Sequence, residues 1–135
     1  MKNIFFLICL ISVFSTAGAS ERVVYGNDFE IISNSYEEES QSVSMGSNTI
    51  ILEGDKIEAN IQMTSGPSCL FEGVKLENNI YGPTEEQKVY GESCRVILEF
   101  KTTEFGKTLN LSSHGNCVSF CGAGAELKAS GLQKF

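Results

Sequence analysis

Residues 49–64, TIILEGDKIEANIQMT, decide the fold. From Ile57 to Met63 every second residue is apolar, and polar residues stand between them. A period of two places alternate side chains on opposite faces, which is typical of a strand with one buried face. The pair Gly54-Asp55 separates this segment from the apolar run before it, and glycine there favours a two-residue hairpin turn. The sequence therefore predicts two antiparallel strands joined at Gly54-Asp55.

The same alternation recurs further along the chain, at residues 94–100 and 123–129. A loop at 102–106 would join the first of these to a strand at 107–112. Shorter strand candidates are residues 22–25, 29–33, 69–76 and 88–90, and no window of about eleven residues shows helical periodicity. Short strands at this spacing predict an all-β fold, a small antiparallel β-barrel or sandwich of about seven to nine short strands.

The first 19 residues have the order of a secretory signal peptide. Lys2 gives a positive start, residues 4–14 form an apolar run, and Ala17-Gly18-Ala19 matches a cleavage site. A membrane anchor is the alternative, but a spanning helix needs roughly 20 apolar residues, which this run does not provide. We expect cleavage after Ala19, no stable membrane anchor, and a single β-rich domain at 20–135 that is periplasmic or secreted.

Two polar segments are expected to be loops. Residues 33–48 are rich in Ser, Glu, Asn and Gln and contain the acidic run Glu37, Glu38 and Glu39. Such a segment cannot bury a face of its own, so it is predicted to be a polar acidic loop or arm. Its acidic run is either a solvated connection or an electrostatic contact with a cationic partner. The second predicted loop spans residues 82–93.

The cysteine count predicts two disulfides. Cys9 leaves with the signal peptide, and an exported domain keeps Cys69, Cys94, Cys117 and Cys121. Four cysteines allow three connectivities, which sequence alone leaves open. The preferred pairing is Cys69 with Cys94, at the base of the second loop, and Cys117 with Cys121. A zinc site would need paired C-x2-C or H-x3-H spacings, which are absent, so no metal is expected.

No catalytic constellation can be assembled from the sequence. His114 is the single histidine, and nothing in the sequence places a nucleophile and an orienting carboxylate beside it. Adjacent carboxylates occur in any acidic domain and carry no specific signal. We therefore expect neither enzymatic activity nor a cofactor.

The charge balance indicates the class of partner. The chain has 10 basic and 17 acidic residues, a net charge of −7, and loss of Lys2 leaves nine basic residues and −8. Nucleic-acid binders need lysine and arginine clusters to displace counterions, so nucleic acid is excluded, and a basic protein partner is favoured. The alternative is a small-ligand β-barrel, whose interior would be widened by Ala59, Ala123, Ala125 and Ala129. The oligomeric state stays open.

The C-terminal third carries a resemblance. Its segment Cys117-Val118-Ser119-Phe120-Cys121-Gly122-Ala123-Gly124-Ala125 resembles the C-x3-C-G-A-x-A strand that ends some small uncharacterised periplasmic proteins of Gram-negative bacteria. In its general make-up the chain also resembles the small periplasmic lysozyme inhibitors. That resemblance implies a protein that inserts a Ser-Gly-containing loop into a basic hydrolase. The Ser-Gly steps at Ser65-Gly66 and Ser130-Gly131 lack the tyrosine that follows closely in that pattern, so no site residue is carried over.

Overall fold

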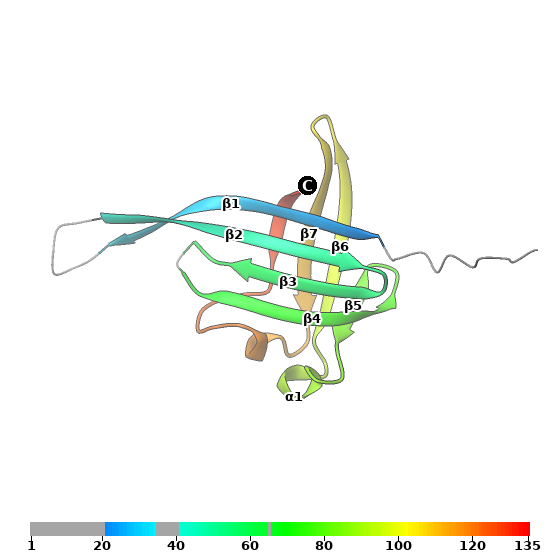
Figure 1. Ribbon diagram of the computed structural model, residues 1–135. Helices are drawn as coiled ribbons and strands as arrows, with labels where there is room; N and C mark the ends of the chain where they lie inside the picture. The colour runs from blue at the N-terminus through cyan, green and yellow to red at the C-terminus, as the bar shows by residue number, and fades with distance from the viewer. Residues whose placement is uncertain (1–20, 35–40, 65) are drawn as a thin grey trace, which may run out of the picture.

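The hairpin predicted around Gly54-Asp55 lies within an eight-stranded antiparallel β-barrel (Figure 1). The structure is a computed structural model that describes residues 21–34, 41–64 and 66–135. In these ranges the elements are β1 (Arg22–Asn34), β2 (Gln41–Glu53), β3 (Lys56–Gln62), β4 (Ser68–Glu77), β5 (Ile80–Pro83), α1 (Lys88–Gly91), β6 (Arg95–Thr103), β7 (Gly106–His114), η1 (Val118–Phe120) and β8 (Ala129–Lys134).

The barrel has the simplest antiparallel topology. Each strand pairs with the next strand along the chain, and β8 pairs with β1 to close the sheet. The closing contact is short, because only Tyr25 with Lys134 and Gly26 with Gln133 are paired in register. Closure removes the free edges that an open sheet would expose. The all-β prediction is confirmed, and of its two architectures the chain adopts the barrel.

The alternating pattern determines which side chains fill the barrel. Ile57, Ala59 and Ile61 of β3 are buried, whereas Glu58 and Asn60 between them are exposed. All seven of the remaining strands also contribute to the core cluster. Its members include Tyr25, Ile50, Phe71, Tyr81, Val96, Leu98, Leu109, Leu111 and Leu132. The barrel interior is therefore a packed hydrophobic core.

Two of the predicted strands are wrong. Residues 88–90 form the short helix α1, because the N–H groups of Gln87 and Lys88 both bond to the carbonyl of Thr84 and turn the chain. Most of the segment 123–129 is irregular. Gly124 has φ +81°, and Ala125 N–H bonds to Gly122 O, so a turn interrupts the alternation there and β8 starts only at Ala129.

The predicted loop at 33–48 is also corrected. β1 and β2 pair in continuous register from Arg22 opposite Glu53 to Asn34 opposite Gln41. The pairing of β2 with β3 starts only at Thr49, so the far half of this hairpin extends away from the barrel as a two-stranded arm (Figure 1). Hydrogen bonds between the two strands keep the polar segment 41–48 extended even though it has few residues to bury. The second predicted loop, 82–93, contains the end of β5 and all of α1.

Candidate interaction surface at the capped end of the barrel

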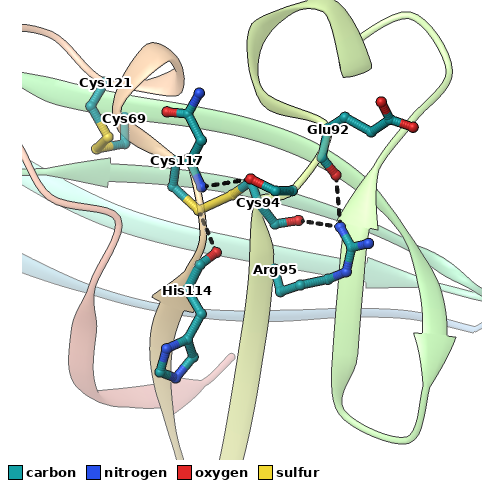
Figure 2. The surroundings of a disulfide bond; sticks show 9 residues. Cys69, Glu92, Cys94, Arg95, His114, Cys117 and Cys121 are labelled. Carbon is teal, nitrogen blue, oxygen red and sulfur yellow. Dashed lines mark hydrogen bonds between the residues drawn. A yellow bond between two sulfur atoms is a disulfide. The ribbon is translucent and has the colours of Figure 1, made fainter.

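Both disulfides lie where α1 and η1 cover one end of the barrel, which we call the capped end (Figure 2). Cys69 bonds to Cys121 with an S–S distance of 2.00 Å, and Cys94 bonds to Cys117 at 2.03 Å. The four predicted cysteines are thus all bridged, but the preferred pairing of Cys69 with Cys94 and Cys117 with Cys121 is wrong.

Strand pairing explains the observed connectivity. Arg95 stands opposite His114 in the β6–β7 hairpin, so Cys94 and Cys117, which flank this hairpin, are brought together. Cys121 runs antiparallel beside Cys69 of β4, and Gly122 N–H donates to Ser68 O at 2.8 Å. The sequence contained the signal for the Cys94–Cys117 pair, because it predicts the hairpin of β6 and β7, whose register places Cys94 near Cys117.

An edge-to-face series of aromatic rings joins the capped end to the core. Phe120 of η1 packs against Phe71 in the core with ring centroids 5.2 Å apart, and Tyr90 of α1 packs against Phe120 at 6.3 Å. Gly91 allows a close approach of the two segments, because a Cβ at that position would collide with Asn116 O. Asn116 N–H in turn donates to Ser93 Oγ at 3.0 Å. These contacts hold α1 and η1 against each other.

The outer side of the capped end exposes apolar side chains. Val89 is 82% exposed, Val118 77% and Tyr90 52%. A hollow of about 200 Å³ lies beside Val118. Its wall comprises Ser113, Gly115, Cys117, Val118, Cys121, Ala125, Glu126 and Leu127. Val89 and Tyr90 lie on α1 and Val118 on η1, and these two segments pack together, so their exposed apolar side chains are the candidate binding surface.

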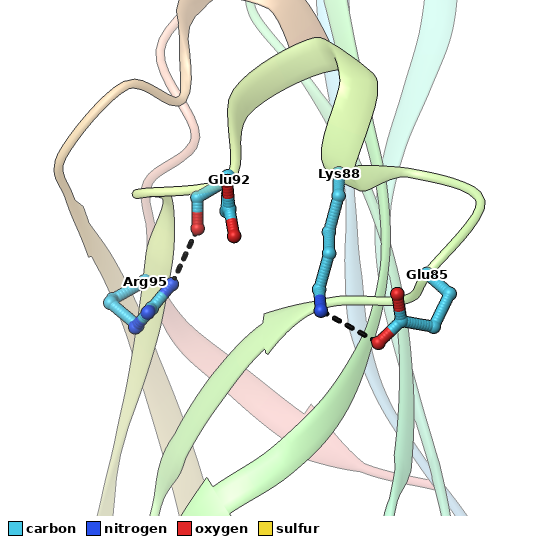
Figure 3. A network of polar contacts seen from close by, with 4 residues as sticks. All are labelled: Glu85, Lys88, Glu92 and Arg95. Carbon is cyan, nitrogen blue, oxygen red and sulfur yellow. Dashed lines mark hydrogen bonds and ion pairs between the residues drawn. The ribbon is translucent and has the colours of Figure 1, made fainter.

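The charged groups of the capped end are unevenly paired (Figure 3). Lys88 Nζ donates to Glu85 Oε1 at 2.6 Å, and this contact raises the pKa of the Lys88 ammonium. The Arg95 guanidinium donates to two backbone carbonyls, Glu92 O and Cys94 O, each at 2.8 Å. Within the described ranges the carboxylates of Glu86, Glu92 and Glu126 form no ion pair. Glu86 and Glu92 flank α1 in the sequence, and Glu126 lines the hollow beside Val118, so each apolar segment has an acidic residue near it.

A second hollow, of about 250 Å³, lies on the barrel wall. Ile51 and Thr84 contribute to its lining, together with Glu58 and Glu72, which face each other across β3 and β4. Like charges in directly opposed positions destabilise a strand pair. Both hollows open to the surface, and the barrel interior is occupied by side chains.

The remaining predicted site residues lie elsewhere. Glu37, Glu38 and Glu39 fall outside the described residues. His114 is exposed at the end of β7, and its imidazole points away from the disulfides (Figure 2). In the described part of the chain, no three side chains of His, Cys, Asp or Glu gather as metal ligands would. The sequence did not single out exposed Val89 and Val118, because Val89 belongs to the predicted strand 88–90 and Val118 lies between the cysteines of the preferred Cys117–Cys121 pair.

Comparisons with known proteins give no relative. Neither the family models, nor the curated proteins, nor the solved structures include a match to this chain. The helices described are too short and too polar to span a bilayer.

Proposed function

We propose that this chain is an exported, non-catalytic protein that binds a basic protein partner, such as a cell-wall hydrolase, and inhibits it. The observation that carries the proposal is the packed interior of an acidic barrel. Because the core is filled by large side chains such as Phe71, Tyr81 and Leu109, the surface is the part available for recognition. The net charge is −7 for the whole sequence and −8 for residues 20–135, and such a charge attracts cationic proteins.

The small-ligand barrel has less support. Two of the four alanines expected to widen the interior do not line it, since Ala123 is exposed and Ala125 is only half-buried at the capped end. Ala59 and Ala129 are buried, but they pack among larger side chains of the core. The two hollows, at about 250 Å³ and 200 Å³, lie below the roughly 300 Å³ at which typical ligand pockets begin.

Binding to a purified basic lysozyme tests the proposal. The oxidised chain 20–135 is immobilised, and the dissociation constant is measured at about 50 mM and about 300 mM salt, alongside the rate of cell-wall lysis. We expect inhibition of lysis and an affinity at least about tenfold weaker at the higher salt, mainly through slower association.

A panel of other basic peptidoglycan hydrolases extends the same measurement, and an acidic hydrolase of similar size is the control. The acidic enzyme should not bind at either salt concentration. Failure of every basic hydrolase to bind at low salt, or binding that does not depend on salt, would argue against the proposal.

A further inference from the structure

We propose that the capped end is the surface that docks on the basic partner. Its apolar centre would consist of Val89, Tyr90 and Val118, and its acidic rim of Glu86, Glu92 and Glu126. This inference rests on the proposed function and adds to it the location of the contact and the chemistry of the partner. The partner is a basic protein that presents an apolar side chain between lysine or arginine residues.

The exposed centre has the composition of an interface. Contiguous exposed apolar side chains mark interaction sites on soluble proteins, whereas scattered single ones do not. α1 and η1 are adjacent, since Tyr90 and Phe120 pack with centroids 6.3 Å apart, and Val89 and Val118 extend from these two elements. Tyrosine is also among the residues that contribute most to binding energy in protein interfaces. The hollow beside Val118 offers a depression for a partner side chain.

Covalent bonds hold this surface in place before any partner arrives. Cys117 and Cys121 flank η1 on both sides, and their bridges connect it to the start of β6 and to β4. The ring of Phe120 anchors the same element on Phe71. A surface that is already ordered loses little conformational entropy on binding, which favours affinity.

Electrostatics select the occupant. Lys88 is paired with Glu85, whereas Arg95 and Lys128 form no ion pair in the described ranges. The carboxylates of Glu86, Glu92 and Glu126 outnumber these two cations, so they are left to interact with a partner. A second copy of the exported chain, residues 20–135, would bring another net charge of −8 against the same rim. Like-charge repulsion disfavours that arrangement, whereas a basic protein gains from it.

Matched variants at the two ends of the barrel test the location. Val118→Asp and Val89→Asp alter the capped end, and Phe105→Asp makes the same change at the tip of the β6–β7 hairpin, which extends from the opposite end (Figure 1). Phe105 is 92% exposed, so all three positions should accept aspartate without loss of folding. The affinity is measured for the basic lysozyme, or for the hydrolase of the panel that binds wild type. We expect it to fall about tenfold or more in Val118→Asp and Val89→Asp, but not in Phe105→Asp.

Charge reversal gives a second, independent comparison. The double variant Glu86→Lys/Glu92→Lys should slow association. Glu104→Lys at the hairpin tip should lower the association rate less than half as much, when each decrease is divided by the number of residues changed. Thermal unfolding checks that every variant is folded.

The outcomes separate the two proposals. Equal affinities for wild type, Val118→Asp and Val89→Asp, or a larger loss with Phe105→Asp, would overturn the docking site while leaving the proposed function in place. Self-association of the chain that Val118→Asp abolishes would show that a second copy occupies the surface, and this also overturns the inference. Absence of binding by the wild type to every hydrolase tested would overturn both.

Discussion

At the scale of single residues, Tyr81 of β5 couples the stability of the barrel to pH. Its side chain is 4% exposed, and burial raises the pKa of the Tyr81 phenol above its usual value of 10.0. The negative charge of Asp55 adds to this effect. Lys75 N–H donates to Asp55 O at 2.7 Å, so the β2–β3 turn that carries this carboxylate is held beside β4. The folded state therefore favours the protonated phenol.

We predict that the free energy of unfolding falls as the pH rises above about 10, because the unfolded chain then loses the Tyr81 proton more readily than the folded chain. Below that pH the protonated Tyr81 phenol makes its full contribution to the free energy of unfolding. Urea unfolding at pH of about 8, 10 and 11 should show a steeper loss for wild type than for Tyr81→Phe. Asp55→Asn should weaken the pH dependence without removing it, since burial is the larger cause. Equal slopes for wild type and Tyr81→Phe would refute the assignment.

At the scale of elements, local turn chemistry made the hairpins predictable. Gly54-Asp55 joins β2 to β3 as expected. The β6–β7 connection was expected at 102–106, but strand pairing continues to Thr103 opposite Gly106, and Gly106 has φ +116°. A glycine in this conformation permits a tighter turn than the spacing suggested.

Elements that depend on distant contacts were not predictable. β5 has four residues and is a strand only because β4 and β6 lie on either side of it. α1 begins where Thr84 O accepts two N–H groups, and its Val89 and Tyr90 looked like strand residues in isolation. The Cys69–Cys121 bridge depends on the segment after η1 returning to β4, which no local pattern indicates. The capped end was missed for the same reason.

The disulfides should make unequal contributions to stability. The Cys69–Cys121 bridge spans 52 residues and the Cys94–Cys117 bridge spans 23, so cross-linking removes more unfolded-state entropy in the first case. We expect Cys69→Ala/Cys121→Ala to lower the free energy of unfolding by about 4 kcal/mol and Cys94→Ala/Cys117→Ala by about 3 kcal/mol.

Urea unfolding of the oxidised proteins measures both losses, and digestion without reduction identifies the linked peptides. Wild type should contain no free thiol among these four cysteines. Recovery of a peptide in which Cys69 is linked to Cys94 would contradict the structure. A greater loss from removing the shorter bridge would contradict the loop-entropy argument.

At the scale of the whole molecule, the barrel depends on its last strand. β8 contributes fully buried Leu132 to the core, pairs with both β7 and β1, and is followed by Phe135, whose N–H donates to Val24 O at 2.9 Å. Without β8 the sheet would have two exposed edges and an open core. Closure is therefore a cooperative property that depends on both ends of the described chain.

We predict that a chain ending at Lys128 will not unfold cooperatively and will aggregate, since it lacks Leu132 and exposes the edges of β1 and β7. Leu132→Ala in the full-length chain should lower the free energy of unfolding by about 2–5 kcal/mol. Phe135→Ala, at a side chain that is 79% exposed, should change it by less than about 1 kcal/mol. Thermal unfolding and gel filtration check the three proteins. A monomeric truncated chain with a sharp transition would be inconsistent with closure by β8.

The connectivity of the disulfides has a consequence for maturation. The pairs are nested, because the Cys69–Cys121 bridge encloses the Cys94–Cys117 bridge in the sequence. During synthesis from the N-terminus, Cys69 and Cys94 both emerge before either native partner exists. In an oxidising compartment the first bond available is the non-native one between them. Where that bond forms, a thiolate must attack and break it before the native pairs can form. The yield of correctly bridged protein would therefore depend on a disulfide isomerase, and less on the rate of oxidation.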